Sequence, residues 1–416
     1  MTTAIAEEVS LREMPVTASR RRFYAPELDL LRLFAFLIVF MRHVATGFGI
    51  ARQQAAGAIP SRLAAYSSTT DHNPWILIQG LTQSLDFGVC LFFFLSSYLI
   101  TSLLLIEKNV TGRVDVRDFY VRRTLRIWPL YFAFLAAMVL VGQYQPWLNI
   151  TRYRVVASFL LVANWPIVLH GWIGSPIEPL WSVSIEEQFY LLWPQLARFG
   201  RAAIVATCGL FSIVPFAVIA IVGHMPNCTN PSLWTNSLVQ CLFFASGALT
   251  ATLLGQTVRP IRPATRVLLF VGGWTCWFCA SSVCHVVRTE SPGVGHLVVG
   301  YALVMAGVVL IFLCFFGWRP AHLPSSLLYL GKITYGLYVF HFFFLEVVLR
   351  VAVASLARFH APALPLLGLH AACAIVALGL TIGCAIMSYT FLERPFLMLK
   401  KRFTIIPSRP ALRRPS

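Results

Sequence analysis

Long apolar runs separated by short polar stretches occupy most of this sequence. A transmembrane α-helix needs roughly 20 apolar residues, and the runs are continuous, unlike the short alternating segments of a β-barrel. A shorter run at 155–169 ends in "NWP" and is predicted to be re-entrant or interfacial. The pattern therefore predicts an all-α integral membrane protein with about ten transmembrane helices, near 28–50, 84–106, 127–142, 181–197, 202–222, 236–254, 266–287, 296–317, 333–356 and 367–391.

Lysine and arginine are divided unequally between the two sets of loops. Ten spans put both termini on one side, and that side carries 24 of the 33 Lys and Arg residues, whereas the opposite loops carry seven. The positive-inside rule then predicts that both termini are cytoplasmic. The expected organisation is a basic cytoplasmic tail at 1–27, a ten-helix membrane domain at 28–396 and a second basic cytoplasmic tail at 397–416.

Composition and charge support a membrane protein and argue against a nucleic-acid partner. The chain is 58% hydrophobic and 12% charged, against about 25% charged in typical soluble domains. The net charge of +17 lies mainly between apolar runs, so membrane topology and lipid contact explain it and no nucleic-acid partner is expected. The "CWFC" stretch at 276–279 lies within an apolar run and is interpreted as small apolar residues, so no metal site is expected.

The first predicted span, which includes "LRLFAFLIVFMRHV", carries ionisable residues in an apolar run. Arg32 and His43 are 11 residues apart, about three helical turns, so they share a face. Asp29 lies one turn before Arg32 and can pair with it, while Arg42 points elsewhere and either snorkels or pairs with an acid on another span. An ionisable residue near mid-membrane is a functional hypothesis by default; the alternative is that His43 is a hydrogen-bonding residue between packed helices.

The segment "PLWSVSIEEQFYLLWP" places two adjacent acids, Glu186 and Glu187, in a predicted span. Ser182, Glu186 and Tyr190 recur every four residues and therefore form one polar stripe. The alternative interpretation is an interfacial helix start, with Trp181 as an aromatic residue at the membrane surface.

Basic, acidic and imidazole groups also occur near the ends of other predicted spans. Arg122, Arg123 and Arg126 lie in "DFYVRRTLRIWPLYF", and regularly spaced guanidinium groups suit phosphate binding, although basic clusters are ordinary in cytoplasmic loops. His341 lies within the ninth span, and Glu393 ends the tenth. Together these residues predict a polar interior open to the cytoplasm.

The order of these segments resembles the acyltransferase 3 family of membrane acyltransferases. The similar pieces cover about residues 24–400: "LDLLRLFAFLIVFMRH", "FGVCLFFFLSSYLIT", "RRTLRIWP", "PLWSVSIEEQFYLLWP", "YGLYVFHF" and "SYTFLERPF". Cys90 and Ser97 stand where the family usually has Asp and Gly, and Asp86 is a candidate substitute for the former. The resemblance implies ten membrane helices and transfer of an acyl group, usually acetyl, from cytoplasmic acyl-CoA to a carbohydrate hydroxyl.

The resemblance also implies roles for individual residues. Arg32 and His43 match essential residues of the family, and Glu186 and the Arg123/Arg126 pair match further motif positions. The predicted catalytic residues are His43, Glu186 and Arg32, with His43 either a general base or a covalent acyl acceptor. Acyl-CoA, a co-substrate rather than a bound cofactor, is predicted to contact Arg122, Arg123, Arg126 and Glu393, and the carbohydrate Glu187, Tyr190, Trp181 and His341.

A second class of function fits the same pattern. A transporter or lipid-linked glycan flippase with an intramembrane proton relay would also need many spans and buried ionisable residues. An inverted internal repeat would favour it, and none is evident. The expected location is the bacterial inner membrane, and the sequence does not specify the acceptor.

Overall fold

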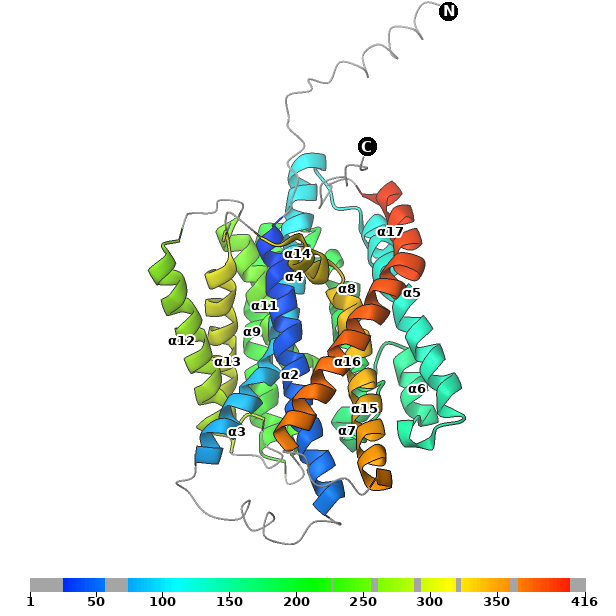
Figure 1. Ribbon diagram of the computed structural model, residues 1–416. Coiled ribbons are helices and arrows are strands. Elements are labelled where there is room, and N and C mark those ends of the chain that lie inside the picture. Colours follow the sequence, from blue (N-terminus) through cyan, green and yellow to red (C-terminus); the bar gives the residue numbers. More distant parts are fainter. Residues whose placement is uncertain are drawn as a thin grey trace, which may run out of the picture.

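The computed structural model describes residues 25–56, 74–225, 228–255, 261–287, 293–318, 323–359 and 366–404, and these residues form a helical bundle (Figure 1). The predicted tail residues 1–24 and 405–416, and loop positions such as Arg62, lie outside the described residues. The long helices are α2 (Pro26–Ala56), α4 (Gly88–Thr111), α5 (Val116–Gly142), α8 (Leu180–Ala197), α9 (Arg201–Gly223), α11 (Ser237–Leu254), α12 (Pro263–Ser282), α13 (Val294–Phe315), α15 (Thr334–Phe359) and α16 (Leu366–Ser388).

Shorter helical segments connect or extend these helices. They are α3 (Pro74–Ser84), η2 (Leu85–Phe87), η3 (Pro146–Leu148), α6 (Arg152–Phe159), α7 (Asn164–His170), α10 (Asn230–Trp234), α14 (Ser325–Lys332), the π-helical η4 (Tyr389–Glu393), α17 (Arg394–Lys400) and η5 (Lys401–Phe403). The predicted re-entrant or interfacial run at 155–169 forms α6 and α7, of eight and seven residues. At 1.5 Å per residue neither helix crosses a hydrocarbon core about 30 Å thick.

Within the described residues, seven helical segments are long and apolar enough to cross a membrane, so the chain is a multi-pass membrane protein. They are Leu77–Thr111, Val116–Gly142, Arg201–Gly223, Ser237–Leu254, Val294–Phe315, Thr334–Ala352 and Gly368–Phe403. Helices α2, α8 and α12 occupy the other three predicted windows. Whether all ten cross the membrane, and on which side the termini lie, remain predictions.

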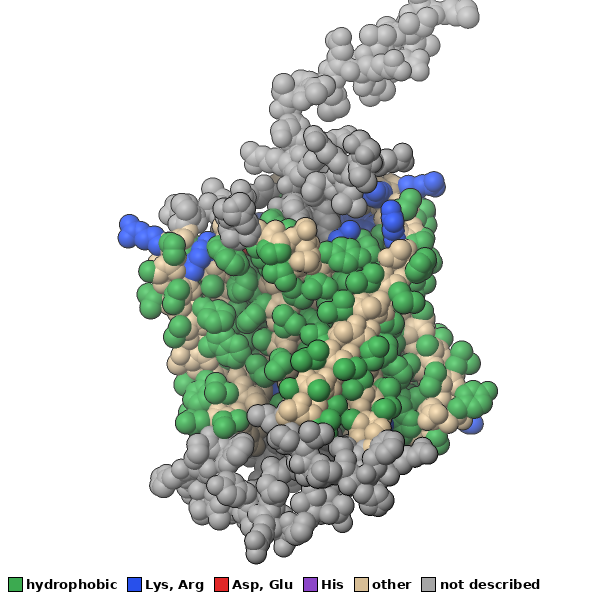
Figure 2. Space-filling model, in the orientation of Figure 1, with side chains coloured by type: hydrophobic (Ala, Val, Ile, Leu, Met, Phe, Trp, Pro, Cys, Tyr) green, Lys and Arg blue, Asp and Glu red, His purple; other side chains and the backbone are tan. Residues whose placement is uncertain are grey.

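Basic residues gather at one end of the bundle. The start of α2 and helix α17 lie at this end, which is uppermost in Figure 1. Figure 2 shows a broad hydrophobic band with Lys and Arg side chains along its upper edge. Arg113, Arg198, Arg262 and Lys401 belong to connections or helix ends there. We call this the basic end; the predicted charge asymmetry is visible in this arrangement.

Helices α4 and α11 form the interior of the bundle. About 72% of the most apolar window around α4 is buried, against 22% for α9. Gly247 on α11 allows the two interior helices to approach closely, because a Cβ there would lie 2.2 Å from the Phe94 carbonyl oxygen. The two helices therefore form a closely packed pair in the interior of the bundle, and α4 also contributes residues to the cavity described below.

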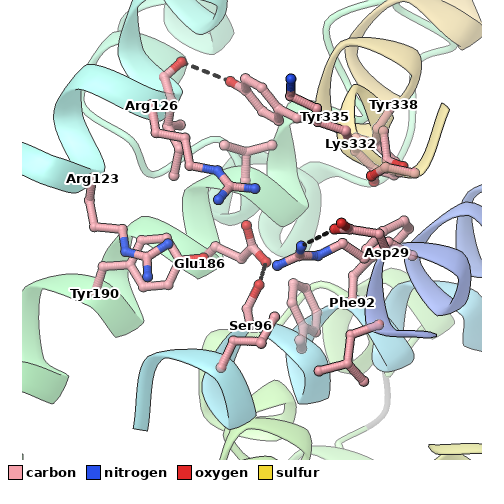
Figure 3. A pocket seen from close by; sticks show the side chains of 18 of the residues that line it. Asp29, Phe92, Ser96, Arg123, Arg126, Glu186, Tyr190, Lys332, Tyr335 and Tyr338 are labelled. Atoms are coloured by element: carbon pink, nitrogen blue, oxygen red, sulfur yellow. Dashed lines mark hydrogen bonds and ion pairs between the residues drawn. The ribbon is translucent and has the colours of Figure 1, made fainter. Parts of the chain in front are cut away.

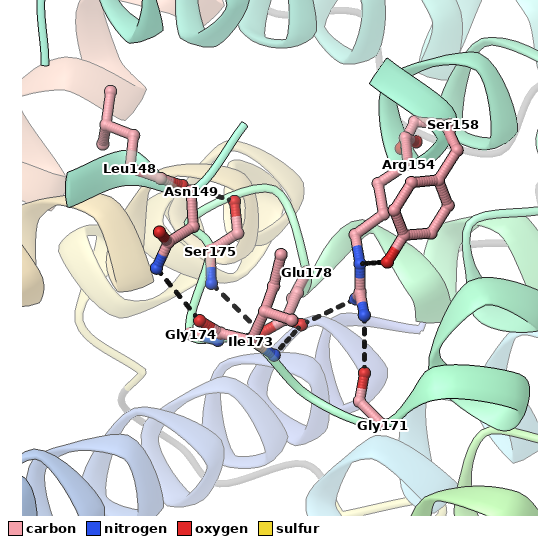
Figure 4. Close-up of polar contacts among 10 residues, drawn as sticks. Leu148, Asn149, Arg154, Ser158, Gly171, Ile173, Gly174, Ser175 and Glu178 are labelled. Carbon is pink, nitrogen blue, oxygen red and sulfur yellow. Dashed lines mark hydrogen bonds and ion pairs between the residues drawn. The ribbon is translucent and has the colours of Figure 1, made fainter. Parts of the chain in front are cut away.

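A buried ion pair fixes the loop that precedes α8 (Figure 4). Arg154 Nη1 lies 2.9 Å from Glu178 Oε1, and the two side chains are 4% and 6% exposed. Glu178 also accepts hydrogen bonds from the backbone N–H groups of Ile173, Gly174 and Ser175. Because α8 begins directly after this loop, the network sets the position of the polar stripe on α8.

Candidate functional site

A cavity of about 160 Å³ with both apolar and charged lining residues lies at the basic end, between α2, α4, α5, α8 and the α14–α15 segment. Figure 3 shows the side chains converging on it. Its charged lining consists of five basic residues and two acids: Arg32, Arg123, Arg126, Lys332, Lys400, Asp29 and Glu186. A surplus of positive charge inside a membrane bundle is costly unless an anion or nearby carboxylates compensate it.

Glu186 is central to this cavity. The predicted polar stripe is present, because Ser182, Glu186 and Tyr190 all line the cavity from α8. Ser96 on α4 donates a short hydrogen bond to Glu186 Oε1. The guanidinium groups of Arg123, Arg32 and Arg126 all act electrostatically on this carboxylate, so one acid organises basic groups from two helices.

Arg32 enters the cavity from α2. Its Nη1 lies 3.2 Å from Asp29 Oδ1, so the pairing expected from their spacing is present. Asp29 is held against α14, where a Cβ on Gly331 would lie 2.3 Å from the Asp29 carbonyl oxygen. This close approach fixes Arg32 in the cavity wall.

Arg123 and Arg126 enter from the N-terminal half of α5, at its eighth and eleventh residues. This helix begins at a capping interaction in which the Asp115 side chain accepts from the Asp118 N–H. Arg123 is stacked between two rings, with its Cζ 5.5 Å from the centre of Phe119 and 5.3 Å from that of Tyr190. The predicted Arg-x-x-Arg pair therefore lies in the cavity with its charge presented towards Glu186.

His43 is not among the residues that line this cavity. It lies farther along α2, where its ring centre is 5.1 Å from that of His341 on α15. His341 in turn lies 5.3 Å from the ring of Tyr338, which does line the cavity. The structure thus places His43 behind a layer formed by Tyr338 and His341. Arg32 lines the cavity together with residues of α14 and α15, and His43 contacts α15 through His341.

Arg42 points away from His43 and pairs with an acid on another helical segment. Its Nε donates to Asp86 Oδ2 at 2.8 Å, and its guanidinium also donates to Thr46. Of the two possibilities for Arg42, snorkelling or pairing, the structure shows pairing.

Several predicted site residues have other neighbours. Glu187 accepts a hydrogen bond from Trp128 and does not line the cavity. Trp181 is 4% exposed and packs against Phe93 and other aromatic rings. Both residues therefore lie on α8, close to the cavity, but neither lines it.

Two further predicted donor-binding residues also lie outside the cavity lining. Arg122 binds Glu107 Oε2 at 3.0 Å and the Phe403 carbonyl at 2.8 Å. Glu393 is 6% exposed on the π-helical segment η4 and accepts from Ser388. Arg126 acts electrostatically on Glu393, which makes Glu393 a neighbour of the cavity's basic cluster.

The sequence analysis did not single out several lining residues: Ser96, Lys332, Tyr335, Tyr338 and Lys400. Tyr335 donates to the Ile127 carbonyl at 2.9 Å, and Tyr338 shares a 2.7 Å hydrogen bond with Ser182. The i, i+3 spacing of Tyr335 and Tyr338 in the sequence could have indicated that they share one face of a helix. Lys400 lay in a stretch interpreted as a tail, but α17 continues the C-terminal helix and brings it to the cavity.

Comparisons with known proteins agree with this arrangement. Residues 26–389 match the family model for the acyltransferase 3 domain, described as "Acyltransferase domain". YrhL of Bacillus subtilis, provisionally named a peptidoglycan O-acetyltransferase, is 29% identical over 61% of this chain and 43% of its own length. The peptidoglycan O-acetyltransferase OatA of Listeria monocytogenes and the O-acetyltransferase OatA of Staphylococcus aureus are each 27% identical over 61% of this chain, and over 44% and 45% of their own lengths.

The chain thus spans less than half of the length of these relatives in each comparison. No solved structure matches. The family match covers most of the chain and includes the helices that build the cavity and carry His43. The chain therefore belongs to the acyltransferase 3 family of membrane acyltransferases.

Proposed function

We propose that this protein is a membrane O-acetyltransferase that moves an acetyl group from acyl-CoA, entering at the basic end from the cytoplasm, to a carbohydrate hydroxyl. The observation that carries the proposal is the basic cavity, whose wall at Tyr338 adjoins the His341–His43 pair. Family membership and the names of the relatives support the reaction class. Their names also make peptidoglycan a candidate acceptor.

The charge of the cavity suits the phosphates of coenzyme A. Guanidinium groups bind phosphate through paired charge-assisted hydrogen bonds, and Arg123 and Arg126 lie one turn apart in the cavity wall. The cavity volume of about 160 Å³ is below the 300–1,000 Å³ of pockets that enclose a drug-sized ligand. We infer that it receives the narrow pantetheine arm, while the nucleotide stays at the basic mouth.

His43 supplies the proton chemistry in this proposal. A neutral imidazole takes the proton of the acceptor hydroxyl, whose oxygen attacks the thioester carbonyl carbon. The carbon–sulfur bond breaks, and the leaving thiolate takes the proton from His43. In the covalent variant His43 first accepts the acetyl group and then passes it to the hydroxyl. Arg32 and Glu186 orient the part of the acyl donor that lies in the cavity.

The thioester must pass the Tyr338 layer to meet His43. Tyr338 is held by the hydrogen bond to Ser182, and rotation of one aromatic side chain would join the cavity to the histidine pair. Such a step would keep water away from the thioester until the acyl arm displaces the ring.

Transfer can be measured with purified protein reconstituted in vesicles. Labelled acetyl-CoA and soluble glycan fragments are supplied, and release of free CoA thiol is followed together with label in the glycan. The proposal predicts acceptor-dependent thiol release with matching acetylation. Glycan movement across the bilayer without any acetylation would instead support the transporter or flippase reading and overturn the proposal.

A further inference from the structure

His341 has one ring nitrogen engaged and the other without a partner. Its side chain is fully buried on α15. Nδ1 lies 2.5 Å from the backbone carbonyl oxygen of Tyr338. Nε2 is buried and has no hydrogen-bond partner among the described residues.

This geometry fixes the tautomer of His341. A carbonyl oxygen can only accept, so Nδ1 must carry the hydrogen. In a neutral imidazole the other nitrogen is then a lone-pair acceptor. A buried acceptor without a donor costs free energy, so Nε2 of His341 requires an N–H or O–H donor to face it.

The ring neighbours of His341 include one that can supply this donor. Phe36 and Phe342, with ring centres at 5.9 and 6.4 Å, are apolar. Tyr338 has a hydroxyl, but it already shares a 2.7 Å hydrogen bond with Ser182. His43, at 5.1 Å between ring centres, is the remaining described ring neighbour with a hydrogen-bonding nitrogen, and a small ring rotation brings a nitrogen of each imidazole to hydrogen-bond distance.

We propose that His341 is the positioning residue for His43: its Nε2 accepts the N–H of one His43 nitrogen and leaves the other His43 nitrogen as the lone pair that reacts. The inference rests on the proposed function and deepens it. His341 neither gains nor loses a proton during transfer. It selects the tautomer of His43 and stabilises the imidazolium that forms when His43 takes the hydroxyl proton, as a buried hydrogen-bond acceptor does for other catalytic histidines.

A matched pair of variants separates the two ring nitrogens of His341. His341→Asn keeps an amide N–H near the Nδ1 position and loses the acceptor at Nε2. His341→Gln carries an amide oxygen near the Nε2 position. Phe342→Leu is the packing control. The ring centre of Phe342 lies 5.0 Å from that of His43, and the Phe342 side chain carries no polar atom.

The expected result is a split between turnover and donor binding. His341→Asn should lower kcat by about 10²–10⁴ with the KM for acetyl-CoA nearly unchanged, His341→Gln should recover at least about tenfold of that loss, and Phe342→Leu should retain most of kcat. Equal kcat in the Asn and Gln variants, or a kcat near wild type in His341→Asn, would overturn the inference.

Histidine tautomers can also be read without turnover. In protein labelled with ¹⁵N-histidine, solid-state NMR should show a single neutral tautomer for His43 in the wild type and a mixture in His341→Asn. An unchanged His43 tautomer in that variant would overturn the positioning role. If the wild type transfers no acetyl group, the proposed function fails, while this spectrum still decides whether His341 sets the state of His43.

Discussion

Replacing Arg123 and Arg126 together by alanine should weaken acyl-CoA binding much more than it weakens the fold. Each charge-assisted contact to phosphate contributes about 1.5–3 kcal/mol, so two contacts correspond to about 3–6 kcal/mol, or a factor of roughly 10²–10⁴ in Kd. The folded state loses the stacking of Arg123 on Phe119 and Tyr190, about 0.5–2 kcal/mol for each ring. It also loses two of the three guanidinium groups that act on Glu186, while Arg32 and the Ser96 hydrogen bond remain. Binding should therefore be lost in a protein that is still folded.

The assay is equilibrium binding of labelled acetyl-CoA to protein in lipid nanodiscs, with thermal unfolding measured on the same samples. The matched control is Lys401→Ala with Arg402→Ala, which removes the same charge from exposed positions at the same end. Lysine at 123 and 126 should give intermediate affinity, because it keeps the charge and loses the guanidinium fork. Equal losses in the cavity and control variants would show a diffuse electrostatic effect and refute the assignment of these arginines as phosphate ligands.

Two further predictions concern stability and sidedness. Glu178→Ala should destabilise the protein by about 3–5 kcal/mol because it leaves Arg154 charged and buried; thermal unfolding checks this, and a melting temperature equal to wild type would contradict it. In a cysteine-free background, Thr229→Cys should react with an impermeant thiol reagent in intact cells, and Arg402→Cys should react only after permeabilisation; the reverse pattern would invert the predicted topology.

The long helices could be predicted from the sequence because membrane burial demands continuous apolar runs. Each of the ten windows contains or overlaps a long helix. The ends of the helices were harder to predict from the sequence. Helix α5 begins at Val116 rather than near 127, because Asp115 caps a polar, arginine-rich first part of the helix that a search for apolar runs leaves out. The C-terminal helix likewise continues past residue 396 to Lys400.

The cavity could be predicted only where residues repeat along one helix. The i, i+4 stripe on α8 correctly joined Ser182, Glu186 and Tyr190. Trp181 and Glu187 share the same helix but face other neighbours, which adjacency in sequence cannot reveal. Lys332 and Lys400 reach the cavity from segments distant in the chain, and such tertiary contacts leave no local pattern.

The separation between the cavity and His43 also required the structure. Spacing placed Arg32 and His43 on one face; in the structure Arg32 lines the cavity, and His43 contacts His341 of α15. It gave no sign that Tyr338 and His341 would lie between His43 and the basic cluster. In the proposed mechanism, the acyl arm must therefore pass this layer in a step separate from donor binding.

The most direct test of the account is the rate of acetyl transfer by His43→Gln, measured in a single turnover with saturating labelled acetyl-CoA. Glutamine keeps a hydrogen-bonding side chain for helix packing but cannot act as a base or an acyl acceptor. The account predicts a folded protein with near wild-type acetyl-CoA affinity and a transfer rate lower by about 10²–10⁴ or more. Transfer at a rate near wild type would show that His43 only packs between helices, and would contradict its assignment as the reacting residue.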